Sequence, residues 1–347
     1  MTDQKLNSYK FDVKVGGDPE FFIFNKNTKR YVSAHNRVPG TKKEPFVLNK
    51  ASPSETIQAD GTAVEINIKP STMPSYFLES IHNILKQTRK LFLRPYEVLV
   101  ASPCVTYSPK DWEKLPKSAL ELGCDPDYNA YTGMRNPTPD PAKFLPRSRT
   151  GAGHISLSWR KADNLAHPFD PEHFSDCAAV VRRLDLLYFL YMYPYVEGEY
   201  TPYSALSAYR HQLYGARGAF RPKPWGVEYR SPSNLWLLSI DTVGNMVQLA
   251  KAALVSTIME VPDTVIVEQA QYNQQSFNSL NTTYCHVIPA TVAKRYPQVF
   301  DPTPAFLPNS IMNLAYRHKR KSSAYAKNMH LKAPSILKPG DYEYVRS

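Results

Sequence analysis

Several common catalytic signatures are absent from this sequence, and each absence removes a class of protein. There is no lysine-containing phosphate loop and no Gly-x-Gly-x-x-Gly fingerprint, so a nucleotide would need another kind of site. No Gly-x-Ser-x-Gly turn occurs either, which leaves serine–histidine–aspartate catalysis without support.

Cysteine is scarce and widely spaced. The four cysteines, Cys104, Cys124, Cys177 and Cys285, form no Cys-x-x-Cys pair, so neither a zinc site nor a disulfide framework is indicated. Reduced thiols in a cytosol are the simplest interpretation. Cys285 precedes His286, but adjacent strand residues point to opposite faces, so the pair does not predict a catalytic dyad.

Long apolar runs are also missing. No run of 18 apolar residues exists, so we expect no membrane span. The first residues, Met-Thr-Asp-Gln-Lys-Leu-Asn-Ser, lack an apolar signal core, and we therefore expect no cleaved signal peptide.

Positive charge is in excess. The chain of 347 residues is 42% hydrophobic, which allows a substantial core, and carries a net charge of +11. That charge favours anionic partners such as nucleotides, acidic peptides or nucleic acid, although a basic surface without a dedicated partner fits equally well. The clearest basic cluster, residues 317–321, contains no interleaved aromatic residues, so we interpret it as a solvated tail rather than a nucleic-acid site.

The order of the expected elements predicts an α+β fold, because strands come first and helices that can pack on one sheet face follow. Residues 108–149 are predicted to be a long ordered loop. Strands are expected at 11–24 (two, around a Gly16-Gly17 turn), 62–69, 96–101, 153–159 and 227–230, and helices after Pro74, at 171–193 and at 234–258.

The most informative stretch is residues 225–230, Trp-Gly-Val-Glu-Tyr-Arg. In a strand, alternate side chains share a face, so Glu228 and Arg230 point one way while Val227 and Tyr229 point the other. One face can then pack on a core while the other carries charged groups.

The same alternation recurs in three other predicted strands. Asp18 shares a face with Glu20, and Glu65 with Asn67, while His154 shares one with two serines. The sequence therefore predicts an antiparallel sheet whose open face carries acids, a histidine and an arginine.

Carboxylates at these positions indicate a metal site. Hard cations such as Mg²⁺ take oxygen ligands, and Glu20, Glu65 and Glu228, with Asp18 as a fourth, could hold two such ions. Each alone could be an ordinary exposed strand residue. Glutamate is depleted in strands, however, so three at matched positions favour a functional interpretation.

Other polar residues are candidates for binding phosphate. The planar guanidinium groups of Arg210 and Arg230, and secondarily Arg221, suit bidentate phosphate contacts, with surface ion pairs as the alternative. His154 could bind a metal or a nucleotide phosphate, or be structural. Asp60, before Gly61, fits a hairpin turn as well as a catalytic role. Asp125 and Asp127, on either side of a proline, we interpret as part of a loop.

An ordered series of short motifs resembles a known family. The motifs are Gly17-Asp18-Pro19-Glu20-Phe21, Asp60-Gly61-Thr62-Ala63-Val64-Glu65, Gly153-His154-Ile155, and Tyr214-Gly215 through Phe220-Arg221 to Gly226-Val227-Glu228-Tyr229-Arg230-Ser231. Together they are similar to the phage-encoded carboxylate–amine ligases, which are amidoligases of the glutamine synthetase-like superfamily. The resemblance spans residues 11–240.

The resemblance implies a curved antiparallel sheet with helices on one face, whose concave face holds Mg²⁺ and ATP. It implies phosphorylation of a carboxylate, followed by attack of an amine to give an amide. Carried over by motif, the metal ligands would be Glu20, Glu65 and Glu228, with His154 at the metal–nucleotide site. Arg210 and Arg230 would stabilise the transferring phosphoryl group.

One position departs from the family pattern. Asn67 stands where a second carboxylate is often found, and Asp18 could supply the missing charge.

The same resemblance sets the remaining expectations. Residues 1–262 would be the catalytic domain and 263–347 a C-terminal extension with a basic tail. The substrates would be amino acids, peptides or peptidoglycan stem peptides, and the protein would act in the cytoplasm of an infected bacterium.

Two other function classes stay open. A non-enzymatic virion or nucleic-acid-associated protein on a degenerate ligase fold would use the basic charge. A metal-dependent hydrolase would need an activated water but no nucleotide contacts, so it leaves Arg210 and Arg230 unexplained.

Overall fold

A computed structural model describes residues 13–120, 127–140, 143, 145–198, 201–258, 260–264 and 266–267. The strands are β1 (Lys14–Gly17), β2 (Glu20–Asn25), β3 (Arg30–Val32), β4 (Phe46–Val47), β5 (Thr56–Asp60), β6 (Ala63–Ser71), β7 (Glu97–Val100), β8 (Cys104–Thr106), β9 (Tyr128–Asn129), β10 (Ser148–Thr150), β11 (Ile155–Ser158), β12 (Ala219–Lys223) and β13 (Gly226–Tyr229). The helices are α2 (Pro74–Phe92), α3 (Pro109–Trp112), α4 (Lys117–Leu120), α5 (Pro171–Tyr191), α6 (Tyr193–Val196), α7 (Ser204–Leu213), η2 (Asn234–Leu237) and α8 (Ile240–Ile258).

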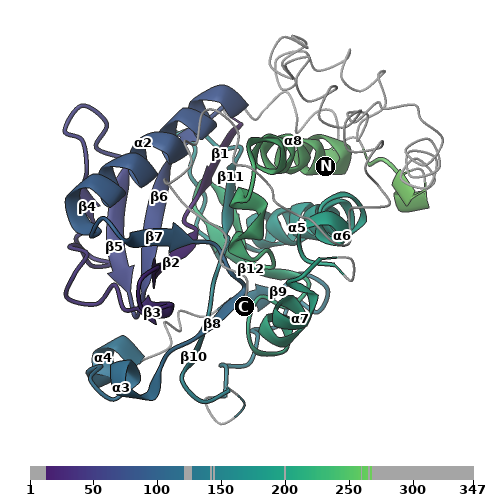
Figure 1. The fold of residues 1–347 in the computed structure, drawn as a ribbon. Coiled ribbons are helices and arrows are strands. Elements are labelled where there is room, and N and C mark those ends of the chain that lie inside the picture. The colour runs from purple at the N-terminus through teal and green to yellow at the C-terminus, as the bar shows by residue number, and fades with distance from the viewer. Residues whose placement is uncertain are drawn as a thin grey trace, which may run out of the picture.

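A large antiparallel sheet organises the fold. In the described part of the chain, its main path runs β3-β2-β6-β1-β11-β13-β12-β9, and β4, β5 and β7 pair beside it. Helices α2, α5 and α8 lie side by side against one sheet face, and α8 contacts both of the others (Figure 1). The predicted α+β class, with an antiparallel sheet and helices packed on one face, is confirmed.

The buried face of the sheet follows the predicted alternation. Val64, Ile66 and Ile68 of β6 lie in the main core, as do Val227 and Tyr229 of β13. This burial fixes which way each strand faces, because a shift of one residue would turn its apolar side chains away from the helices.

The helices have clear starts. Pro74 and Pro171 stand in the first turns of α2 and α5, where a missing N–H costs nothing. Asp170 caps α5 by accepting a hydrogen bond from the backbone N–H of His173 at 3.0 Å. The single helix predicted over 234–258 is instead divided into η2 and α8. Ser239 and Thr242 make reciprocal side-chain-to-backbone hydrogen bonds at 3.0 Å, which start a new helix there.

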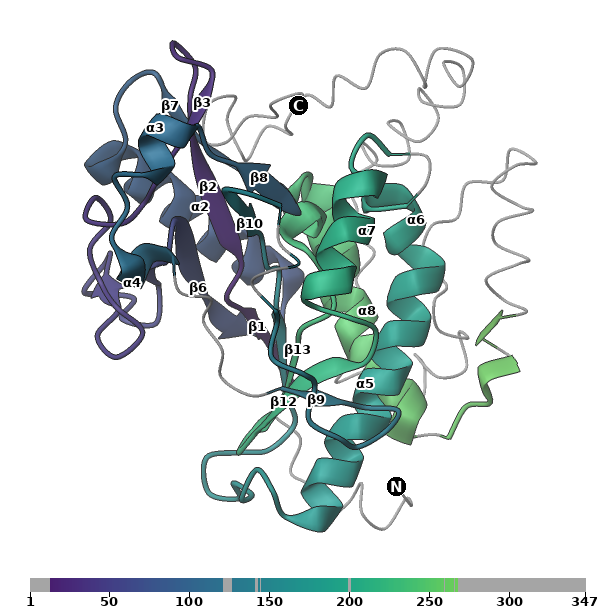
Figure 2. The ribbon, with the colours of Figure 1, turned by 90° about the horizontal axis from the view of Figure 1, so that it is seen from below.

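Two sequence expectations about the loops are wrong. Gly16 and Gly17 form no turn, because both belong to β1, and the break falls at Asp18 and Pro19. The predicted loop at 108–149 contains α3, α4, β9 and the start of β10. Figure 2 shows the β8–β10 pair between β2 and α7.

One buried polar residue attaches helix α5 to the end of β13 near Arg230. Asp185, inside the apolar stripe of α5, accepts hydrogen bonds from Tyr229 at 2.6 Å, Tyr131 at 3.0 Å and Ser231 at 3.3 Å. Burial raises the pKa of the Asp185 carboxyl, and these three donors oppose that rise. The side chain therefore fixes the residues on both sides of Arg230.

Gly153 and Gly244 provide a matched test of this packing. A Cβ at Gly153 would collide with the carbonyl of Ser233 and the indole of Trp236, whereas nothing lies within 4 Å of a Cβ at Gly244 in α8. We expect Gly153→Ala to lower stability by about 1–3 kcal/mol. Gly244→Ala should raise it by about 0.5–1 kcal/mol, because alanine favours a helix. Denaturant melts of both variants test the contrast, which equal effects would contradict.

Candidate functional site

The open face of the sheet carries a cavity of about 410 Å³. Seven of the eight predicted site residues line it: Asp18, Glu20, Glu65, His154, Arg221, Glu228 and Arg230. Residues up to 212 positions apart in the sequence thus meet at one place, since Asp18 and Arg230 both line the cavity. Arg210 is the predicted residue that the structure does not bring to the cavity wall.

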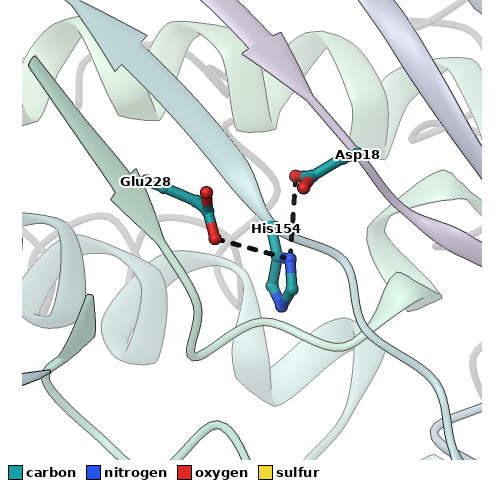
Figure 3. A group of neighbouring side chains, drawn as sticks. All are labelled: Asp18, His154 and Glu228. Carbon is teal, nitrogen blue, oxygen red and sulfur yellow. Dashed lines mark ion pairs between the residues drawn. The ribbon is translucent and has the colours of Figure 1, made fainter. Parts of the chain in front are cut away.

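One group of metal-ligand side chains is Asp18, His154 and Glu228, which Figure 3 shows pointing toward one another. Nδ1 of His154 lies 3.6 Å from Oδ1 of Asp18 and 3.9 Å from Oε1 of Glu228. The three come from the β1–β2 connection, the residue directly before β11 and the middle of β13. Because β11 pairs with both β1 and β13, the sheet itself sets their spacing.

Protein cations balance the charge of Glu228. Its carboxylate pairs with Lys223 at 2.7 Å, with Arg221 at 3.2 Å and with Nη1 of Arg230. Burial alone would raise the pKa of the Glu228 carboxyl, but these cations and His154 hold it well below its usual range. Glu228 is therefore ionised and surrounded by groups that can also bind phosphate.

The second group is Glu20, Asp60 and Glu65, whose ligand atoms also lie within 4.8 Å of one another. Glu20 and Glu65 are directly opposite each other on β2 and β6, and Asp60 ends β5. Lys42 reaches Asp60 at 3.2 Å, and the backbone N–H of Ala152 donates to Glu20 at 3.0 Å.

These three acids carry more negative charge than their surroundings offset. Burial, followed by repulsion from Asp60, raises the pKa of Glu20 to about 7. The pKa of Glu65 is raised well above its usual range by burial and by Asp18, Asp60 and Glu20. A divalent cation would remove the repulsion, so this donor set fits a hard metal ion. The buried Oδ1 of Asp18, which has no hydrogen-bond partner, indicates the same need in the first group.

The structure assigns the acids differently from the sequence in two respects. Asp18 was expected to supply the charge missing at Asn67, but it lies with His154, and Asp60 is the third acid beside Glu20 and Glu65. Asn67 lines the cavity and donates to the hydroxyl of Thr56 at 2.9 Å. Asp60 precedes the turn at Gly61, as the hairpin interpretation expects, and it also lines the cavity.

Arg210 has a different environment from the one expected of a phosphate ligand. Its guanidinium is fully buried and donates to the carbonyls of Gly151 at 2.8 Å, Ser231 at 2.7 Å and Pro232 at 2.9 Å. A longer contact of 3.4 Å reaches the carbonyl of Arg230. Its donors are used by the backbone, so Arg210 holds together the two loops that carry His154 and Arg230.

Sequence reasoning missed other residues at the cavity. Asp127, interpreted as part of a loop, pairs with Nε of Arg230 at 3.2 Å, and Lys223 binds Glu228. Tyr214 was noted only as part of a motif, yet its hydroxyl lies 2.9 Å from Nε2 of His154. No local pattern signals Asp127, because it reaches Arg230 across 103 residues of sequence.

Several sequence features lie outside the described residues: Cys124, Asp125, the Cys285–His286 pair and the basic cluster at 317–321. Cys104 and Cys177 are buried free thiols. Within the described residues, none of the helices combines the length and apolar character needed to cross a membrane.

Comparisons with known proteins give distant structural matches. No family model matches the chain, and no curated protein sequence matches it. One similar solved structure is described as a novel glutamine synthase homolog, with a TM-score of 0.39 at 12% identity over 94% of this chain and 70% of that one.

Two further structures are similar at the same level. A bifunctional glutathione synthetase from Pasteurella multocida gives a TM-score of 0.41 at 11% identity, over 93% of this chain and 49% of that one. Plasmodium falciparum glutamine synthetase gives 0.36 at 12% identity, over 73% and 54%. The chain spans about half the length of these two proteins. Matches at these TM-scores do not assign an activity to this chain.

The raised pKa of Glu20 predicts a pH dependence of cation binding. Between its usual value of 4.5 and about 7, the folded protein keeps a proton that the unfolded chain has lost, so stability without metal falls as pH rises through this window. A cation must displace that proton below about pH 7. We therefore expect Mg²⁺ to raise the melting temperature more at about pH 8 than at about pH 5.5.

Thermal melts with and without Mg²⁺ at both pH values measure this difference. Glu20→Gln should reduce it, whereas the matched change Glu113→Gln, on an exposed residue outside the cavity, should not. An equal shift at both pH values would contradict the assignment of the second group as a cation site.

Proposed function

We propose that this protein is an ATP-dependent carboxylate–amine ligase that requires Mg²⁺. The observation that carries the proposal is the meeting of two groups of side chains that could hold metal ions and three cationic side chains in one cavity. A hydrolase with a metal-bound water would need the acids, but it gives no reason for Arg221, Lys223 and Arg230 to surround one of them.

Both groups have the donor chemistry for Mg²⁺. Glu20, Asp60 and Glu65 would hold one ion, and Asp18, Glu228 and His154 a second. When bound, such ions neutralise charge on phosphate oxygens and so favour phosphoryl transfer.

Arg230 is the residue best placed to bind the transferring phosphoryl group. It is 4% exposed, it lines the cavity, and Asp127 at 3.2 Å together with Glu228 fixes its orientation. Its planar fork of donors matches phosphate oxygens, and a fixed donor costs little reorganisation during the reaction. Arg221 and Lys223 can act beside it by turning from Glu228 to phosphate.

Arg210 keeps a role of another kind in this proposal. It orients the loops that carry His154 and Arg230 by binding their carbonyls, so it supports the cofactor-binding residues without touching the nucleotide. This replaces the direct phosphate contact expected from the sequence.

The proposed reaction has two steps. A substrate carboxylate oxygen attacks the γ-phosphorus of ATP, forming an acyl phosphate and releasing ADP. An amine then attacks the acyl carbon and loses a proton to solvent, and phosphate leaves with the electrons of the broken C–O bond. The cavity contributes fixed positive charge where phosphate charge develops.

The choice of amide formation rests on the motif resemblance, and the geometry supports its metal and nucleotide parts. The proposed substrates are amino acids, peptides or peptidoglycan stem peptides, and the proposed setting is the cytoplasm of a phage-infected bacterium. Residues 1–262 would form the catalytic unit, to which Asp263 is joined by an ion pair with Arg183 at 2.9 Å and Ile266 by burial in the main core.

A non-enzymatic role on a degenerate ligase fold is the second candidate. It receives less support, because burial and mutual repulsion both raise the pKa values of Glu20 and Glu65, so gathering these acids without a cation is unfavourable. A protein with no metal to bind gains nothing from keeping them.

Magnesium-dependent nucleotide binding tests the proposal directly. Titration calorimetry with a non-hydrolysable ATP analogue should show binding in Mg²⁺ and much weaker binding in EDTA. Glu65→Gln should weaken binding in Mg²⁺ because it removes a ligand charge, while Glu113→Gln should match the wild type. Equal affinity with Mg²⁺ and with EDTA would contradict the proposal.

Substitutions of Glu228 and of Arg230 should change the activity in different ways. Glu228→Gln keeps shape but removes charge, so it should raise the Mg²⁺ concentration needed for ADP release with candidate carboxylate and amine pairs. Arg230→Lys keeps charge but loses the planar fork, so turnover should fall by about 10²–10³-fold with little change in ATP affinity.

Arg217→Lys is the matched control, because Arg217 is exposed and lies outside the cavity lining. Wild-type turnover and Mg²⁺ dependence in both Glu228→Gln and Arg230→Lys, on a working substrate pair, would show that this strand end is structural.

A further inference from the structure

Tyr214 lies between a candidate metal ligand, His154, and a candidate phosphate-binding residue, Arg230. It follows α7 directly and lines the cavity, and its backbone N–H donates to the carbonyl of Arg210 at 2.7 Å. The next residue, Gly215, has a left-handed backbone with φ +67, and a Cβ there would press on the Arg210 guanidinium. The backbone around Tyr214 is therefore closely confined.

The hydroxyl of Tyr214 has two partners in the site. Its oxygen lies 2.9 Å from Nε2 of His154 and accepts a hydrogen bond from Nη2 of Arg230. Guanidinium groups only donate, so the hydroxyl hydrogen stays available for Nε2 of the imidazole. Its ring also lies near two cations, 5.3 Å from the Arg230 guanidinium carbon and 5.5 Å from that of Arg210.

These contacts decide which nitrogen of His154 faces the acids. With Nε2 held by Tyr214, Nδ1 points toward Asp18 at 3.6 Å and Glu228 at 3.9 Å. Histidines that bind metals commonly hydrogen-bond through their other nitrogen, which fixes the ring and its tautomer. Among the described residues, the hydroxyl of Tyr214 is the hydrogen-bond partner of Nε2 of His154.

We propose that Tyr214 is a positioning residue that links the metal ligand His154 to the phosphate-binding Arg230 through its hydroxyl. The inference rests on the proposed function, because it takes Asp18, His154 and Glu228 to be a metal site. A hydroxyl suits the task because it can donate to Nε2 or accept from it. It can therefore hydrogen-bond to either tautomer of the neutral ring. When Nδ1 binds a cation, the ring proton is on Nε2, and the hydroxyl oxygen then accepts a hydrogen bond from it.

The expected consequence is a local loss of metal affinity. Removing a hydrogen-bond partner of a metal-binding histidine typically costs about 10–100-fold in metal affinity. Tyr214→Phe should show this loss at one of the two proposed cation sites and leave the group of Glu20, Asp60 and Glu65 unchanged. The same variant should weaken the mutual strengthening of cation and nucleotide binding, because Arg230 loses its link to His154.

The experiment is a Mn²⁺ titration of the full chain, followed by the spectroscopic signal of free Mn²⁺, with and without a non-hydrolysable ATP analogue. The variants are Tyr214→Phe and, as control, Tyr107→Phe. Tyr107 is a buried tyrosine whose hydroxyl contacts the carbonyl of Thr62 at 3.4 Å and which does not line the cavity. Melting curves without metal show whether either variant has lost its fold.

A double-substitution cycle separates positioning from simple packing. If Tyr214 acts through His154, Tyr214→Phe should add little to the loss caused by His154→Gln. Fully additive losses would overturn the inference, as would unchanged Mn²⁺ affinity in Tyr214→Phe while the wild type binds Mn²⁺ and nucleotide. If the wild type binds neither Mn²⁺ nor nucleotide, that result contradicts the proposed function itself. The proposed role of Tyr214 is then contradicted as well, because it depends on that function.

Discussion

Negative charge gathered on the open face of one sheet is the constraint on which the rest of this structure depends. Around Glu228 the chain supplies its own cations, and the pKa of that carboxyl is held low. Around Glu20 and Glu65 it supplies too few, and burial together with repulsion between the acids raises the pKa values of both carboxyls. The two groups differ in how they are balanced, although both line one cavity, and this difference explains why a bound cation would change one more than the other.

The open face of the sheet is supported by the packing of the opposite face against the helices. The reverse side of β6, β11 and β13 packs into the main core beneath α2, α5 and α8, so the strands cannot shift without exposing apolar surface. Arg210 and Asp185 extend this support to the loops next to the site, through buried hydrogen bonds to carbonyls and hydroxyls. The charged groups therefore meet in fixed positions, which is what binding of a highly charged ligand requires.

The parts of the site that sequence could predict are those fixed by strand alternation. The opposite facing of Glu228 and Val227 follows from a period of two, and the structure places Glu228 at the cavity and Val227 in the core. The same rule correctly predicted that Glu20, Glu65 and His154 share the open face. Helices α2 and α5 were predictable from their apolar spacing and their initial prolines.

What sequence could not predict depends on contacts between distant segments. Asp18 and Glu20 are two residues apart in the sequence. Because the strand is interrupted at Pro19, Asp18 lies with His154 and Glu228, whereas Glu20 lies with Asp60 and Glu65. Arg210 resembles a phosphate ligand in sequence, and only the approach of the carbonyls of Gly151 and Ser231 shows that its donors are used. Asp127 and Tyr214 are recognisable as site residues only in the folded structure, where both contact Arg230.

The central claim is that the two groups of side chains hold divalent cations in one nucleotide-binding cavity. Crystals grown with Mn²⁺ and a non-hydrolysable ATP analogue test it most directly, because anomalous scattering locates manganese independently of the protein model. The account predicts one peak among Glu20, Asp60 and Glu65 and a second among Asp18, His154 and Glu228, with the analogue's phosphates beside Arg230. Nucleotide bound elsewhere, or manganese absent from both groups, would contradict it.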